Sequence, residues 1–220
     1  MNAGLDATQL ALLSHELRGA LTVVRGLNDL LRSGLPPEQQ ASALEGIDRA
    51  VMRMNALIES ARDAEAPANS AGWETVDLAT LASGIVEEQR AITGREILLQ
   101  GEAGLSVNGD VNALSRALAN VIDNALKYSF AKHPVEVRVY ADGSSAIIDV
   151  ADRGPGIPEE CRTEVFQPFE RLGHDDSIPG TGLGLAVVSS VAESHGGTAL
   201  ALEREGGGAL VRLVLPLAGS

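Results

Sequence analysis

The chain is poor in several features that mark common classes of protein. Its 220 residues include one cysteine, Cys161, which excludes an internal disulfide, and its four scattered histidines form no cluster of zinc ligands. No stretch approaches the roughly 18 uninterrupted apolar residues of a membrane-spanning helix. The N-terminus also lacks a basic segment followed by an apolar one. These absences predict a soluble protein of the reducing cytoplasm that makes no direct contact with a membrane.

Positive charge is also scarce. The chain has 17 Lys and Arg residues against 30 Asp and Glu residues, which gives a formal net charge of −13 and a pI near 4.7. Because such a surface repels other polyanions, we expect neither nucleic acid nor an anionic membrane as a partner. The hydrophobic content of 45% is sufficient to bury a core, and the length suits one large domain or two small ones.

The first third of the chain predicts two amphipathic helices. Apolar residues recur at spacings of three and four over residues 5–33 and again over 37–65, and Gly34–Pro37 separates the two runs. The apolar seam of such a hairpin is too wide for one partner to cover. Pairing two hairpins into a four-helix bundle would cover it, so we expect a homodimer through residues 5–65. Packing of the hairpin on the rest of the chain is the alternative.

A mixed pattern of helices and strands follows a stretch of linker composition at residues 64–72. We therefore expect a helical hairpin at 1–66, a linker at 67–73 and a second domain at 74–220. Within the second domain the periodicity predicts helices at 78–93, 110–129 and 183–196, with an irregular stretch at 153–181. Strands are expected at 74–77, 96–100, 105–107, 134–140, 145–151, 198–204 and 209–215. Helices on one face of a largely antiparallel sheet form an α/β sandwich.

The predicted helix at 110–129 carries the most selective polar pattern of the chain. At about 100° per residue, Asn120, Asn124 and Lys127 lie nearly opposite the apolar stripe, and Tyr128 borders them. An amide oxygen is a neutral hard ligand for Mg²⁺, a lysine can reach a phosphate oxygen, and a tyrosine ring can lie against a base. Taken by itself, this row fits a solvated helix face better than a site.

Two glycine-containing turns follow. Gly154 and Gly156 follow Asp152, which ends a buried-looking strand, within four residues, and they let the backbone turn tightly under a ligand. The run Gly180–Leu185 opens another helical pattern, so its backbone amides and the positive end of the helix dipole can face phosphates. This run is not a Walker A loop, because neither lysine of the chain follows a glycine.

A histidine and an acidic residue stand together on the first predicted helix. His15 is two residues from both Leu13 and Leu17, which places its side chain away from the apolar seam and toward water. A neutral imidazole nitrogen is available at neutral pH to accept a phosphoryl group. Glu16 can hold the other ring nitrogen or accept a proton.

In their order along the chain these blocks resemble the N, G1, F and G2 boxes of the Bergerat-type ATPase fold. Sensor histidine kinases, gyrase-type topoisomerases, heat-shock chaperones and mismatch-repair ATPases share that fold. Phe166–Phe169 matches the F box, and Ser14–Arg18 is similar to the H box of histidine kinases. The resemblance covers nearly the whole chain. It implies a dimeric four-helix bundle followed by an α/β sandwich of the Bergerat type.

The resemblance also implies an activity and a set of roles. It implies a protein-histidine kinase that autophosphorylates His15, with Glu16 as acid/base, and passes the phosphoryl group to an aspartate of a response regulator receiver domain. The cofactors are then ATP and Mg²⁺, with Asn124 as metal ligand and Asn120 assisting. Asp152 accepts a hydrogen bond from the exocyclic amine of adenine. The remaining expected nucleotide-site residues are Lys127, Tyr128, Gly154, Gly156, Phe169, Arg171, Gly180, Thr181, Gly182, Leu183 and Gly184.

The match has departures and alternatives. The family motif commonly continues with Thr-Pro, whereas this chain has Gly19 and Ala20, so the hydroxyl that orients the dephosphorylating water is missing and phosphatase activity is doubtful. The alternatives are a histidine phosphotransfer protein with a degenerate ATP domain, a noncatalytic ATP-binding scaffold, and a chaperone or topoisomerase ATPase fragment. His174 and His195 are expected at the surface and at a helix end, not as ligands.

Overall fold

The computed structural model describes residues 7–65, 72–168, 170, 182 and 184–219. The chain forms two compact units, Met1–Pro67 and Ala68–Ser220, each of which is described by itself below. Six of the residues singled out above, namely Phe169, Arg171, His174, Gly180, Thr181 and Leu183, lie outside the described residues.

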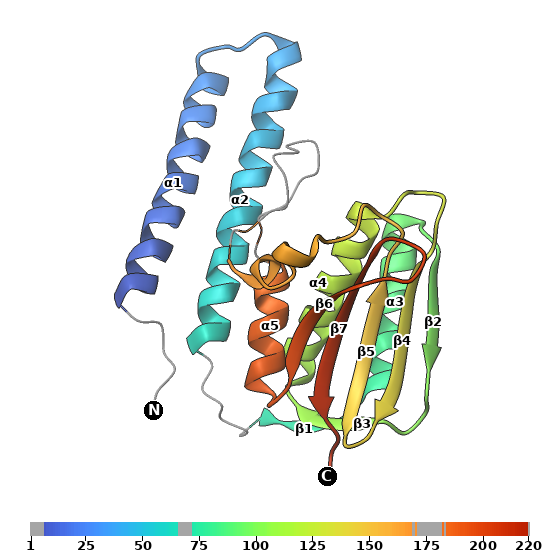
Figure 1. The fold of residues 1–220 in the computed structure, drawn as a ribbon. Coiled ribbons are helices and arrows are strands. Elements are labelled where there is room, and N and C mark those ends of the chain that lie inside the picture. The colour runs from blue at the N-terminus through green and yellow to red at the C-terminus, as the bar shows by residue number, and fades with distance from the viewer. Residues whose placement is uncertain (1–6, 66–71, 169, 171–181, 183, 220) are drawn as a thin grey trace. The chain divides into compact units, whose positions relative to one another are not determined.

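The first unit is a hairpin of two helices (Figure 1). Helix α1 spans Ala7–Arg32 and helix α2 spans Pro37–Glu65, and a turn through Gly34, with φ of +90°, joins them. Pro37 opens α2, a position where its missing N–H leaves no hydrogen bond unmade. The described residues of this unit that are buried are three alanines and one leucine, namely Ala20, Ala43, Ala50 and Leu57.

One hairpin leaves much of its apolar surface uncovered. In this unit, large apolar side chains with 38 to 54% of their surface exposed include Leu21, Val23, Leu30, Leu44, Val51 and Ile58. Exposed apolar side chains that gather into a contiguous patch mark an interaction site in a soluble domain. Leu21, Leu44, Val51 and Ile58 belong to the apolar spacing expected from the sequence, whereas Val23 and Leu30 do not. The identity of the partner stays a prediction.

The second unit is a five-stranded sheet in the order β2-β4-β5-β7-β6. The β2–β4 pair is parallel and the other three pairs are antiparallel. A short separate sheet pairs β1 with β3. The strands are β1 Glu74–Asp77, β2 Ile97–Gly101, β3 Ser106–Gly109, β4 Val135–Asp142, β5 Ser145–Ala151, β6 Thr198–Glu203 and β7 Ala209–Pro216.

Three helices, α3 Leu78–Thr93, α4 Val111–Tyr128 and α5 Gly184–Ser194, pack on one face of the larger sheet (Figure 1). Asp77 caps the start of α3, because its carboxylate accepts the N–H of Thr80. Asp110 caps the start of α4 by accepting the N–H groups of Asn112 and Ala113. Arg95 donates to the carbonyl of Leu126 at 3.1 Å and so supports the other end of α4.

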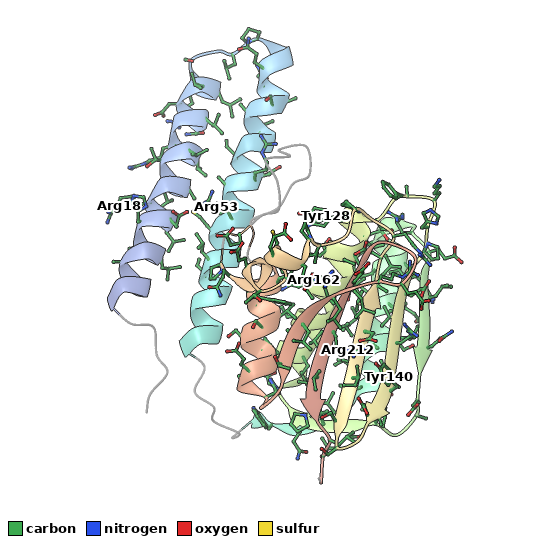
Figure 2. The ribbon with its side chains drawn as sticks, viewed as in Figure 1. Arg18, Arg53, Tyr128, Tyr140, Arg162 and Arg212 are labelled. Atoms are coloured by element: carbon green, nitrogen blue, oxygen red, sulfur yellow. The ribbon has the colours of Figure 1, made fainter. Side chains whose placement is uncertain are left out.

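The central strand β5 is buried on both faces. Ala146, Ile148 and Val150 face the helices and belong to the main core. On the opposite face Asp149, 2% exposed, accepts from Arg212 Nε at 2.7 Å and from the hydroxyl of Tyr140 at 3.1 Å (Figure 2). This network satisfies a carboxylate that would otherwise be costly to bury.

The structure differs from the sequence-based expectation in three places. The stretch expected to be irregular contains two short 3₁₀ helices, Glu159–Cys161 and Glu164–Phe166. His195 lies at a helix end but is buried, not at the surface: it is 5% exposed and stacks on Trp73 with ring centroids 4.8 Å apart. Strands β1 and β3 form a sheet of their own.

Within the described ranges, no helix has the length and apolar character needed to cross a membrane.

Candidate active site

Helix α4 positions the asparagine row. Its apolar stripe is at most 5% exposed and comprises Leu114, Leu118, Val121, Ile122 and Ala125. The opposite face meets the start of α5, where Asn120 Nδ2 donates to the carbonyl oxygen of Gly184 at 3.4 Å. A methyl group added at Gly184 would lie 3.5 Å from Asn124 Nδ2. The two asparagines therefore adjoin the first turn of α5, and both are half-buried.

The last turn of α4 carries the other two polar residues of the row. Lys127 Nζ lies 2.5 Å from the Asp123 carboxylate, one helical turn earlier, and both side chains are partly exposed. Tyr128 ends the helix with 36% of its surface exposed (Figure 2). Contacts of Lys127 and Tyr128 with a nucleotide stay predictions.

Asp152 stands directly after strand β5 and is 7% exposed. Its Oδ1 accepts the N–H of Gly154 at 2.7 Å and that of Ala209 at 3.3 Å. Burial raises the pKa of this carboxyl above its ordinary value, and the two hydrogen bonds oppose that rise in part. Asp152 thus caps the turn that follows it and is at the same time a buried acceptor.

The turn after Asp152 packs directly on the end of α4. A side chain at Gly154 would overlap the carbonyl oxygen of Tyr128, and Gly156 has φ of +81°, so both positions require glycine. Arg153 N donates to the hydroxyl of Ser129, the buried C-cap residue of α4, at 3.3 Å. These contacts hold the Asp152 turn about one helical turn from Asn124 along α4.

The segment around the start of α5 lies next to the polar face of α4. Gly182 has φ of +71°, a conformation that favours glycine. Phe166 packs partly buried against the main core, on a 3₁₀ helix that contacts α5. The start of α5, the polar face of α4 and the end of β5 therefore converge on one region.

On α1 of the first unit, 80% of the His15 side chain is exposed. Its Nδ1 lies 3.7 Å from Glu16 Oε1, and the other oxygen of Glu16 forms an ion pair with Arg53 of α2. The Glu16 side chain is only 22% exposed, so it is held between the imidazole and the neighbouring helix. A methyl group added at Gly19 would have no atom within 4 Å apart from its chain neighbours and the backbone of its own helix.

Family models match both units. The model described as "Histidine kinase-, DNA gyrase B-, and HSP90-like ATPase" matches residues 109–219, about half of the chain. The chain belongs to this family. A second model, the His Kinase A (phospho-acceptor) domain, matches residues 7–67. Together they identify the catalytic core of a histidine kinase and confirm the resemblance drawn from the sequence motifs.

Relatives and solved structures agree with this assignment. The chain is 31% identical over 214 residues to the sensor protein KdpD of Escherichia coli, covering 94% of this chain and 24% of KdpD. It is 35% identical over 196 residues to the signal transduction histidine-protein kinase/phosphatase MprB of Mycobacterium tuberculosis, covering 83% of this chain and 38% of MprB. The chain thus spans well under half the length of these curated relatives. The structure of full-length ShkA in complex with AMPPNP superposes with a TM-score of 0.69 at 28% identity, covering 98% of this chain and 47% of ShkA.

Two charged residues with partners far away in the sequence were not predicted from the sequence. Arg204 is 7% exposed, donates to the backbone carbonyl of Asp152 at 3.3 Å and lies 2.5 Å from Glu136 of strand β4. Arg53 holds Glu16. Each partner pair is far apart in the sequence, and an arginine in a hairpin turn or on a helix surface gives no local signal of burial or pairing.

Proposed function

We propose that this histidine kinase core binds ATP with Mg²⁺ in the second unit, transfers the γ-phosphoryl group to His15, and donates it to an aspartate of a response regulator receiver domain. The observation that carries the proposal is the convergence of a buried carboxylate, two helix asparagines and a helix N-terminus in one unit of an ATPase family member. The AMPPNP complex of ShkA concerns that protein, and it supports the same ligand class here.

The nucleotide would be recognised at two ends. Asp152 offers a desolvated acceptor, which suits the exocyclic amine of adenine better than a solvated carboxylate would, because water competes less in a buried site. The N–H groups at the start of α5 and the positive end of its dipole suit the phosphates. In this proposal Gly154 and Gly156 keep the turn below the base free of side chains.

The residues present fit Mg²⁺ held jointly by protein and phosphates. Within the described residues no group of three His, Cys, Asp or Glu side chains forms a metal cluster. A magnesium ion in a phosphotransferase site needs only one or two protein oxygens beside the phosphates, and the amides of Asn124 and Asn120 supply neutral ones. When bound, the ion would neutralise charge on the phosphates during transfer.

His15 and Glu16 are suited to the acceptor step. A carboxylate 3.7 Å from Nδ1 favours the tautomer that carries the proton there, which leaves the lone pair on Nε2 for attack. As the N–P bond forms, the bond from phosphorus to the bridging oxygen breaks and ADP leaves. The Nδ1 proton can then pass to Glu16, which leaves the imidazole ring uncharged while the transferred phosphoryl group keeps its negative charge. The exposure of His15 leaves it accessible both to the nucleotide and to a receiver domain.

We infer a homodimer through residues 5–65 from the uncovered apolar side chains of the hairpin. A second hairpin is the partner whose surface matches in chemistry and length. The rival reading, a phosphotransfer protein with a degenerate ATP domain, is not favoured, because the ATPase family model matches the second unit through residue 219.

The test is incubation with Mg²⁺ and ATP labelled at the γ-phosphate. We expect label on the protein that is lost in acid and retained in alkali, the behaviour of a phosphoramidate. Label with the opposite stabilities would indicate a phosphate ester and contradict the proposal. ATP labelled only at the α-phosphate is the control, because it reports bound nucleotide without transfer.

A further inference from the structure

The hairpin between strands β6 and β7 has a turn more elaborate than its connection requires. Gly206, Gly207 and Gly208 have φ of +79°, +93° and +106°, all in the region that favours glycine. The β4–β5 hairpin of the same sheet has one such residue, Gly143, with φ of +59°. Two of the three glycines, Gly206 and Gly208, also have close neighbours in the segment that follows β5, whereas Gly207 has open space around it.

The additional requirement is close approach to the backbone of Asp152 and Arg153. A side chain at Gly208 would overlap the Asp152 carbonyl oxygen, and a methyl group at Gly206 would lie 2.8 Å from Arg153 Nη1. Arg153 Nη1 in turn donates to the carbonyl of Gly206 at 2.7 Å. The tip of the hairpin is thus fitted against the turn that carries the buried carboxylate.

Residues 204–209 form hydrogen bonds with the N–H, the carbonyl oxygen and the carboxylate of Asp152. The carboxylate also accepts the N–H of Gly154. The Asp152 N–H donates to the Ala209 carbonyl at 2.9 Å, and the Ala209 N–H donates to Asp152 Oδ1 at 3.3 Å. Arg204 Nη1 donates to the Asp152 carbonyl at 3.3 Å. The position of the carboxylate is therefore set from the β6–β7 side as well as by its own turn.

Two residues of the hairpin, Ala209 and Arg204, bond to Asp152; Arg204 is the charged one, and it is 7% exposed. Its guanidinium bridges two elements: Nη1 reaches the Asp152 carbonyl and Nη2 pairs with Glu136 of β4 at 2.5 Å. A buried charge is tolerated only where such partners compensate for its loss of water. The planar fork of arginine can make both bonds at once, whereas a lysine ammonium has a single nitrogen.

We propose that the hairpin tip, residues 204–209, is a positioning element of the adenine site, and that Arg204 is a positioning residue that orients Asp152 toward the exocyclic amine. The inference rests on the proposed function, because it takes Asp152 as the acceptor for that amine. Arg204 does not touch the nucleotide in this proposal; it acts by holding the carbonyl of the residue that does.

The experiment measures the preference of the protein for ATP over a nucleotide that lacks the exocyclic amine, and not the affinity for ATP alone. The dissociation constants of ATP and of the purine ribonucleoside triphosphate that lacks the exocyclic amine are determined by calorimetry for wild type and variants. Arg204→Met removes the guanidinium while keeping a long apolar side chain. We expect the preference for ATP to fall roughly three- to tenfold, the effect of misplacing one charge-assisted hydrogen bond. Arg204→Lys should fall between wild type and Arg204→Met.

Arg212→Met is the matched control. It breaks another arginine–carboxylate pair of the same sheet, with Asp149, on the face away from the helices (Figure 2). It should lower thermal stability as Arg204→Met does, yet keep the preference for ATP within twofold of wild type. A merely structural role for Arg204 predicts that the two variants behave alike.

The outcomes separate the inference from the proposed function. If wild type prefers ATP and Arg204→Met, shown to be folded by circular dichroism, keeps the full preference, the positioning role is overturned while Asp152 stays the acceptor. If wild type itself binds both nucleotides equally, the role of Asp152 fails and the inference falls with it. If Arg204→Met does not fold, the same measurement on Arg204→Lys decides. A preference for ATP equal to that of wild type in Arg204→Lys overturns the inference, and a reduced preference supports it.

Discussion

Asp152→Asn separates nucleotide recognition from folding. Because Asp152 Oδ1 accepts the N–H groups of Gly154 and Ala209, the oxygen of an asparagine amide should take the same position and keep both bonds. The amide NH₂ then replaces Oδ2 and presents donors to the adenine amine, which is itself a donor. With the charge-assisted bond lost, ATP should bind more weakly by about 1.5–3 kcal/mol, or roughly 10- to 150-fold in Kd.

The same substitution should not destabilise the nucleotide-free protein at neutral pH. Burial raises the pKa of Asp152 in the folded state. The favourable contribution of Asp152 to the unfolding free energy is therefore complete only below the pKa that this carboxyl has in the unfolded chain. The contribution is lost as the pH rises through the pKa of Asp152 in the folded state. Asparagine carries no charge at any of these pH values. Asp152→Asn should thus match or exceed wild type in unfolding free energy at pH 7, and this advantage should shrink toward pH 4.

Two assays check this prediction. Calorimetry with ATP and with inosine triphosphate, which carries a carbonyl in place of the amine, should show that Asp152→Asn loses preference for ATP. Urea unfolding of both proteins at pH 7 and pH 4 gives the stability difference. ATP binding within twofold of wild type would refute the recognition argument. A variant less stable than wild type at pH 7 would refute the argument from burial.

Three further predictions follow from the other elements. Asn124→Ala should remove most kinase activity; unchanged turnover at saturating Mg²⁺ and ATP would place the metal elsewhere. Gly19→Thr, at a position with open space around it, should add the missing hydroxyl and shorten the lifetime of a phosphorylated regulator in the presence of ADP, and it should stabilise α1 by a few tenths of a kcal/mol. A short lifetime with wild type would show that another group positions the water. Trp73→Ala should lower the unfolding free energy of the second unit by at least about 0.5–1.5 kcal/mol, since it removes the stack on His195; an unchanged denaturation midpoint would contradict this.

Local periodicity was sufficient to predict most elements. The helix expected at 110–129 is α4, Val111–Tyr128, and the strand expected at 145–151 is β5, Ser145–Ala151. The apolar stripe of α4 is buried as its spacing requires. Periods of 3.6 and 2 residues are properties of neighbouring positions, so a single sequence contains them.

Contacts between distant segments were not predictable in this way. The polar neighbours of His195, Ser194 and Glu193, suggest a surface position, but Trp73 and the backbone N–H of Asp110 enclose its ring. The burial of Arg204 likewise depends on a glutamate 68 residues away. The parallel β2–β4 pair and the separate β1–β3 sheet also depend on topology, which the local pattern leaves open.

The central claim is that ATP bound through the second unit phosphorylates His15 of the first. Its most direct test is to map the phosphorylated residue by mass spectrometry at neutral pH after incubation with Mg²⁺ and ATP, alongside His15→Gln with its ATP affinity measured in parallel. The account predicts phosphate on His15 in wild type, and none on His15→Gln although that variant binds ATP within about twofold of wild type, an effect below 0.5 kcal/mol. Phosphate on another residue, or retained in His15→Gln, would contradict it.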